Sequence, residues 1–147
     1  MRVEVQINPT LEEPCAILHL SKLTSSIQTA IEILEKEGSN TIISAQAEDK
    51  IFIIPPDSIE IIRTEGGELA LYNTDGKRFI VNRPLYELEQ LLGNDFIRIS
   101  KSALVHFFSI HHFQASFNGT MEVVMNNGIE DIITRSYKPK FKQRLEG

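Results

Sequence analysis

The first residues of the chain place an apolar side chain at every second position. The runs at 3–7 and 16–20 both follow this pattern, and a break that contains two prolines separates them. Alternation with a period of two is typical of a half-buried strand, because successive side chains point to opposite faces. The pattern therefore predicts two short strands near the N-terminus.

A helical period follows these two runs. Apolar residues recur at the i, i+3, i+4 and i+7 spacing of one helix face, at Ile27, Ala30, Ile31 and Leu34. Ser25 and Gln28 have the spacing of a capping box, and Gly38 follows the expected end. We expect this helix and the two strands to form a small α/β region over residues 1–47, completed by a strand at 41–46.

The rest of the chain, residues 48–147, is rich in hairpin signals. Three turn dipeptides each separate two strand-like runs: Asp75-Gly76, Asn118-Gly119 and Asn127-Gly128. Helical stripes occur only at 84–92 and in the tail after Arg135. The expected fold class is mainly β, an antiparallel domain with an α+β appendage that has the order strand, strand, helix.

The charge of the chain is unevenly distributed. The formal net charge is −5, which by itself argues against a nucleic-acid partner. Residues 96–147, however, hold seven Lys or Arg and four Asp or Glu, which gives +3 and leaves −8 for the rest. A polarised chain can offer one basic face to a polyanion, although acidic N-terminal halves also serve solubility.

Cys15 is the only cysteine, so neither a disulfide nor a cysteine-rich zinc site can form within one chain. The N-terminus lacks the apolar core of a signal peptide, and no apolar run approaches the roughly 18 residues of a membrane span. These features predict a cytoplasmic protein.

Sequence motifs for enzymatic chemistry are absent. No glycine-rich phosphate loop, nucleophile elbow or paired acid motif occurs. Among the histidines, His111 and His112 are adjacent, and a regular strand would point them to opposite faces. We expect no catalytic residues, no cofactor and no metal.

Two motifs resemble the signatures of LytTR-type DNA-binding domains. In NDFIRISKSALVHFFSI (94–110), a Phe-x-Arg-x-x-x-Ser core leads to an apolar strand, with matches at Phe96, Arg98, Ser102 and Val105. In NNGIEDIITRSY (126–137), Arg135 and Tyr137 match, and Thr134 replaces the usual serine. The resemblance runs from about 48 to 146. Glu12-Glu13-Pro14 also resembles the opening of the family's small stand-alone regulators.

The resemblance implies a compact antiparallel fold that inserts loops, rather than a recognition helix, into successive major grooves of DNA. By position, two base readers fall on Lys101 and Arg135, both able to donate to guanine O6 and N7. The third falls on or beside Glu68, whose carboxylate can accept from a cytosine amino group. His106 stands where the family usually has asparagine and is expected to organise its turn.

Other polar residues near these loops are candidates for positioning the domain on the DNA backbone. They are Arg98, Ser100, Ser102, Lys138 and Lys140. Three simpler interpretations stay open: Arg135 pairs with Glu130 or Asp131, Lys101 is a solvated turn lysine, and the basic tail is a solvated helix surface.

The function expected from the whole chain is sequence-specific binding of double-stranded DNA by a transcription regulator. The alternative is a protein-interaction module of LytTR-like fold that antagonises or partners another regulator. For residues 1–47 we expect a homodimer contact or a contact with a regulatory partner protein, made through exposed apolar surface.

Overall fold

A computed structural model describes residues 1–11, 15–37 and 41–146 of the chain. The chain divides into two compact units, residues 1–40 and 41–147, and each is described by itself. None of the helices in the described ranges is both long and apolar enough to cross a membrane.

The described part of the first unit contains the helix α1 (Ser25–Glu37), which confirms the predicted helix. Its N-cap differs from the prediction. Thr24, not Ser25, closes the first turn, because its Oγ1 accepts a hydrogen bond from the N–H of Ile27 at 3.3 Å. The predicted Gly38 terminator lies outside the described residues.

The two strands predicted ahead of this helix are not formed, so the expected order strand, strand, helix is corrected. In the described stretches 1–11 and 15–24 no strand is present. The apolar side chains of the first run are largely exposed, from 75% for Val3 to 89% for Ile7. Alternation makes a strand only when the backbone finds a neighbouring strand to pair with, and residues 1–11 pair with no strand among the described residues. The Glu12–Pro14 motif lies outside the described residues.

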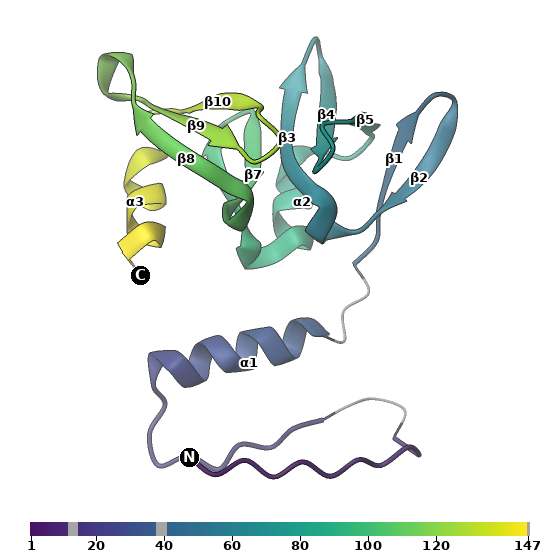
Figure 1. Ribbon diagram of the computed structural model, residues 1–147, viewed down its shortest axis with the longest axis vertical. Helices are drawn as coiled ribbons and strands as arrows, with labels where there is room; N and C mark the ends of the chain where they lie inside the picture. The colour runs from purple at the N-terminus through teal and green to yellow at the C-terminus, as the bar shows by residue number, and fades with distance from the viewer. Residues whose placement is uncertain (12–14, 38–40, 147) are drawn as a thin grey trace. The chain divides into compact units, whose positions relative to one another are not determined.

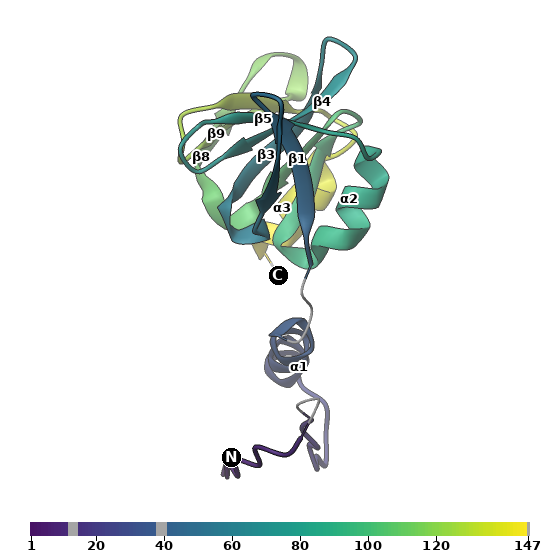
Figure 2. The ribbon, with the colours of Figure 1, turned by 90° about the vertical axis from the view of Figure 1, so that its right-hand side faces the viewer.

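The second unit is built from two antiparallel sheets (Figures 1 and 2). The seven-stranded sheet has the order β2-β1-β5-β4-β3-β7-β6. Its strands are β1 (Ile43–Ala47), β2 (Lys50–Ile54), β3 (Ile59–Glu65), β4 (Glu68–Asn73), β5 (Arg78–Val81), β6 (Phe96–Ser100) and β7 (Ala103–His106). The three-stranded sheet, β10-β9-β8, contains β8 (Ile110–Ala115), β9 (Met121–Met125) and β10 (Glu130–Ile133).

Helices connect and cover these sheets. The two α-helices are α2 (Leu85–Leu92) and α3 (Lys138–Glu146), at the places predicted for helices. Four single 3-10 turns lie between strands or after α2: η1 (Pro56–Ser58), η2 (Gly93–Asp95), η3 (Phe107–Ser109) and η4 (Phe117–Gly119). The predicted antiparallel β domain is therefore present.

The strand predicted at 41–46 exists as β1, but it does not complete a separate α/β region. It pairs with β2 along its length and with β5 through Gln46 and Ile80. The reason is its burial, since Ile43 and Ala45 on one face enter the core of the large sheet. The second compact unit accordingly begins at residue 41, ahead of the expected division at 47/48.

All three predicted hairpin turns are confirmed. Asp75-Gly76 joins β4 to β5, Asn118-Gly119 joins β8 to β9, and Asn127-Gly128 joins β9 to β10. A fourth hairpin, β3 to β4, turns at Gly66-Gly67, where φ values of +57° and +81° suit glycine.

Two hydrophobic clusters lie on opposite faces of the seven-stranded sheet. One packs α2 against the sheet through Leu85, Leu88 and Leu92. The other packs the three-stranded sheet and Phe141 of α3 against β3, β6 and β7. Two neighbouring residues of β3 point into different clusters: Ile62 belongs to the first and Ile61 to the second. The central strands are thus buried on both faces, which holds their turns in place.

Candidate nucleic-acid interface

Backbone hydrogen bonds join the loops that carry the candidate readers. Thr134 N–H, at the end of β10, donates to the carbonyl of Ile99 in β6 at 3.0 Å. Thr64 N–H in β3 donates to Ser102 O, in the β6–β7 turn, at 2.9 Å. The β3–β4 hairpin, the β6–β7 turn and the start of the segment leading to α3 therefore meet at one end of the domain.

Lys101 occupies the exposed β6–β7 turn, and Arg98 holds that turn in shape. The Arg98 guanidinium donates to the carbonyls of Ser100 (3.0 Å) and Lys101 (2.6 Å), and it lies 3.6 Å from Glu89 of α2. Only 16% of the Arg98 side chain is exposed. Lys101 itself is exposed and forms no ion pair with any described residue.

Arg135 is also exposed, directly after the hydrogen-bonded Thr134. Within the described residues it pairs with neither Glu130 nor Asp131. Its side chain runs beside η4 in the β8–β9 turn, where a Cβ added at Gly119 would lie 3.1 Å from Arg135 Cδ. Lys138 Nζ donates to Gly119 O at 3.3 Å. Two cations of the α3 entrance thus adjoin the same turn.

The remaining phosphate candidates differ in their access to solvent. Ser100 is buried, and its hydroxyl lies 3.3 Å from that of Ser102, which is exposed. Lys140 is exposed but lines a cavity of about 590 Å³ between α2, β6 and α3, together with Arg98. Ser102 therefore shares the exposed turn of Lys101, whereas Lys140 is placed beside α2.

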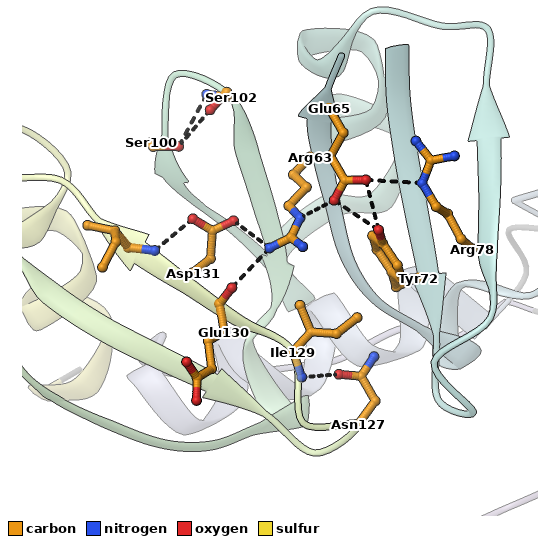
Figure 3. A network of polar contacts seen from close by, with 11 residues as sticks. Arg63, Glu65, Tyr72, Arg78, Ser100, Ser102, Asn127, Ile129, Glu130 and Asp131 are labelled. Carbon is orange, nitrogen blue, oxygen red and sulfur yellow. Dashed lines mark hydrogen bonds and ion pairs between the residues drawn. The ribbon is translucent and has the colours of Figure 1, made fainter. Parts of the chain in front are cut away.

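Glu68 lies in an acidic position at the tip of the β3–β4 hairpin. Glu65 and Glu68 are cross-strand partners that flank the turn. Glu68 is 61% exposed, and its Oε2 lies 4.0 Å from Arg78 Nη2. Figure 3 shows Arg78 and Tyr72 converging on the Glu65 carboxylate, at 3.0 Å and 2.8 Å. The tip of this hairpin therefore carries two acids, and Arg78 of β5 lies within ion-pair distance of both.

Arg63 joins the two sheets and was not singled out from the sequence. Its guanidinium donates to Glu65 at 2.6 Å, to Glu130 O at 2.9 Å and to Asp131 at 3.3 Å (Figure 3). Burial alone lowers the pKa of Arg63, but the two carboxylates outweigh it and raise the pKa. Burial alone raises the pKa of Glu65. The hydrogen bonds from Tyr72, Arg63 and Arg78 outweigh this effect, so the pKa of Glu65 is lowered.

The histidines adopt a geometry that differs from the expectation. His111 and His112 were expected on opposite faces, but a register shift between Ile110 and His112 brings their Nδ1 atoms to 2.8 Å. His106 is buried, stacks edge-on with Phe96 and lies 3.3 Å from the Ser109 hydroxyl. In the described ranges, no three His, Cys, Asp or Glu side chains gather as a metal site.

Comparison with known proteins agrees with this architecture. The family model for the LytTr DNA-binding domain matches residues 49–146. A solved structure of a LytTr DNA-binding domain from Bacillus cereus has a TM-score of 0.67 at 20% identity, and covers 73% of this chain and 98% of that one. The shared fold confirms the mainly antiparallel β class.

Relatives of several lengths match the chain. The sensory transduction protein LytT of Enterococcus faecalis is 30% identical over 76% of this chain, and LytR of Staphylococcus haemolyticus is 24% identical over 98%. The chain spans 46% and 57% of those two proteins, about half of each. An uncharacterized HTH-type transcriptional regulator of Staphylococcus aureus is 24% identical over 99% of this chain and 98% of its own length. The chain therefore belongs to the LytTR family of DNA-binding regulators, which are not enzymes.

Proposed function

We propose that residues 48–147 bind double-stranded DNA in a sequence-specific way and that the protein acts as a transcription regulator in the cytoplasm. The loops at one end of the domain enter successive major grooves, and the DNA bends to meet them. The observation that carries this proposal is the pair Lys101 and Arg135. Both are exposed, on loops joined through the hydrogen bond between Ile99 and Thr134, and neither is ion-paired with a described residue.

In this proposal Lys101 and Arg135 read bases. Each can donate to guanine O6 and N7, and Arg135 can do so with two parallel hydrogen bonds. The absence of an acidic partner among the described residues matters, because a cation already paired within the protein would have to break that contact first. Glu68 would accept from a cytosine amino group, at the cost of repelling the nearby phosphates.

The proposed backbone contacts separate into two kinds. Ser102, on the exposed β6–β7 turn, and Lys138, the half-buried first residue of α3, are proposed to meet phosphates directly. Arg98 and Ser100 are engaged with the β6–β7 turn, so they act chiefly by holding Lys101 in place. Lys140, beside α2, would reach only a phosphate farther along the duplex.

Binding to genomic fragments at two salt concentrations tests the proposal. We expect selective binding that weakens with salt, and preference at one guanine that is lost in Arg135→Ala. Lys50→Ala is the matched control, because it removes one exposed positive charge on β2, the edge of the sheet opposite β6. Absence of selective, salt-sensitive binding by the wild type would refute DNA recognition.

A second candidate function is a protein-interaction module with the LytTR fold that antagonises or partners another regulator. The acids at the tip of the β3–β4 hairpin and the net charge of −5 favour it. The exposure of Lys101 and Arg135 favours DNA. Capture of another regulator by a wild-type protein that binds no fragment would support this alternative.

The N-terminal unit is proposed to form a homodimer through α1. Its apolar stripe is only partly covered in the described unit, because Ile27 and Ile31 are half-buried and Leu34 is 49% exposed. A stripe of this kind gains free energy when a second copy covers it. Sedimentation should give a dimer that Leu34→Glu converts to a monomer. A wild-type monomer at all concentrations would instead favour contact with a regulatory partner protein.

A further inference from the structure

We propose that Phe117 is an additional sequence-reading residue, which contacts the C5-methyl group of a thymine next to the guanine read by Arg135. This inference rests on the proposed DNA-binding function. It adds an apolar contact from a fourth loop, the β8–β9 turn, to the polar contacts of the other three.

Phe117 projects from a turn that the chain holds rigidly. Its side chain is 87% exposed, more than that of any other phenylalanine described. Its carbonyl accepts two hydrogen bonds from Thr120, from the N–H at 3.1 Å and from Oγ1 at 2.6 Å. Ser116 N–H donates to Thr120 O at 3.0 Å and closes the turn. The ring is therefore displayed by a fixed backbone, and within the described residues it makes no ring contact of its own.

The turn lies beside the cations that the proposed function places on DNA. Phe117 is two residues from Gly119, which adjoins the Arg135 side chain and accepts from Lys138. In Figure 1 the β8–β9 turn projects from the same upper edge of the domain as the β3–β4 hairpin. A phenylalanine displayed next to two cations can meet an apolar group on DNA when the cations reach their polar contacts.

The chemistry of the major groove specifies what that apolar group is. The C5-methyl of thymine is the apolar feature that base pairs present there, and phenylalanine is among the side chains that contact it. Burying one methyl group is worth about a fourfold change in affinity. A single contact of this kind distinguishes thymine from cytosine and from uracil without any hydrogen bond.

Replacement of thymine by deoxyuridine removes only this methyl group and so isolates the contact. In the preferred site, each thymine is replaced in turn, and binding of wild type and Phe117→Ala is compared. We expect the wild type to lose about fourfold in affinity at one thymine next to the Arg135 guanine, and Phe117→Ala to lose nothing there. Phe117→Leu should keep part of the effect.

Phe108→Ala is the matched control, because Phe108 is also exposed, at 66%, but lies at the opposite end of β8. It should keep the full sensitivity to deoxyuridine. If Phe117→Ala retains the wild-type sensitivity at every thymine while Arg135→Ala still loses its guanine preference, the Phe117 inference is overturned and the proposed function stands. If the wild type binds no sequence selectively, both the Phe117 inference and the proposed function are overturned.

Discussion

Arg63 Nη1 lies 3.3 Å from Asp131 Oδ2 and thereby ties β3 of the seven-stranded sheet to β10 of the three-stranded sheet. The same guanidinium holds Glu65 beside the turn of the β3–β4 hairpin. Both ends of this bridge adjoin loops that we propose contact DNA, since Glu65 precedes the hairpin turn and β10 leads to Arg135. The relative placement of those loops therefore depends on a contact between two sheets, made by residues that lie far apart in the sequence.

Arg63→Ala should destabilise the domain by about 1–3 kcal/mol, because the partly buried Asp131 would lose its guanidinium donor and Glu65 would keep only two of its three donors, Tyr72 and Arg78. Asp131→Asn should cost less, since the amide oxygen can still accept from Arg63. Urea denaturation measures both. Equal midpoints for Arg63→Ala and the wild type would show that the bridge contributes nothing to stability.

Glu60→Gln should stabilise the domain at neutral pH. Glu60 is buried, which raises its pKa above 4.5, and Asn127 N–H donates to it at 2.9 Å. Because the folded pKa is raised, the native state favours the protonated form, and stability is lost as pH rises through the folded pKa. The glutamine mimics the protonated form. The stability difference in favour of Glu60→Gln should therefore grow as pH rises above about 4.5 and become constant above the folded pKa. Thermal unfolding from pH 4 to 8 tests this, with exposed Glu146→Gln as a control that shows no such trend.

Glu68→Gln should tighten DNA binding by about two- to fivefold at low salt and by less at high salt, because it removes a negative charge from a loop that we propose faces phosphates. Titration of a labelled duplex at two salt concentrations measures the effect. If Glu68 also reads a cytosine as proposed, the variant should lose a preference at that base pair. Binding that does not tighten at low salt would contradict the charge argument.

Gly119→Ala should flatten the guanine preference attributed to Arg135. An alanine Cβ would lie 3.1 Å from Arg135 Cδ and displace that side chain, and the φ of +76° adds strain of about 1 kcal/mol. Gly128→Ala is the control, since its φ is +89° but nothing lies within 4 Å of the added Cβ. The two variants should lose similar stability, and only Gly119→Ala should lose selectivity. If both variants keep the same guanine preference, the result would contradict the role of Arg135 as a base reader.

Much of the fold could be predicted from local patterns. The hairpin at Asp75-Gly76 and the helices α1 and α2 follow from turn dipeptides and helical stripes, which act over a few neighbouring residues. The pattern at 3–7 was equally regular and formed no strand, because a strand also needs a partner that local sequence does not specify. For the same reason β1 was assigned to the wrong neighbours, although its position was nearly right.

For the candidate site, the sequence by itself determined the family and the residue types at the loop positions, including Lys101 and Arg135. Only the tertiary structure decided which groups are available there. It engaged Arg98 and Ser100 within their turn, brought Arg78 from β5 to the acidic hairpin tip, and set Arg135 beside the turn that carries Phe117. The contacts of Arg98 and Ser100 are local to one turn, but those of Arg78 and Arg135 join residues from different strands or turns. The pairing and packing of strands, rather than any local pattern, brings such residues within contact distance.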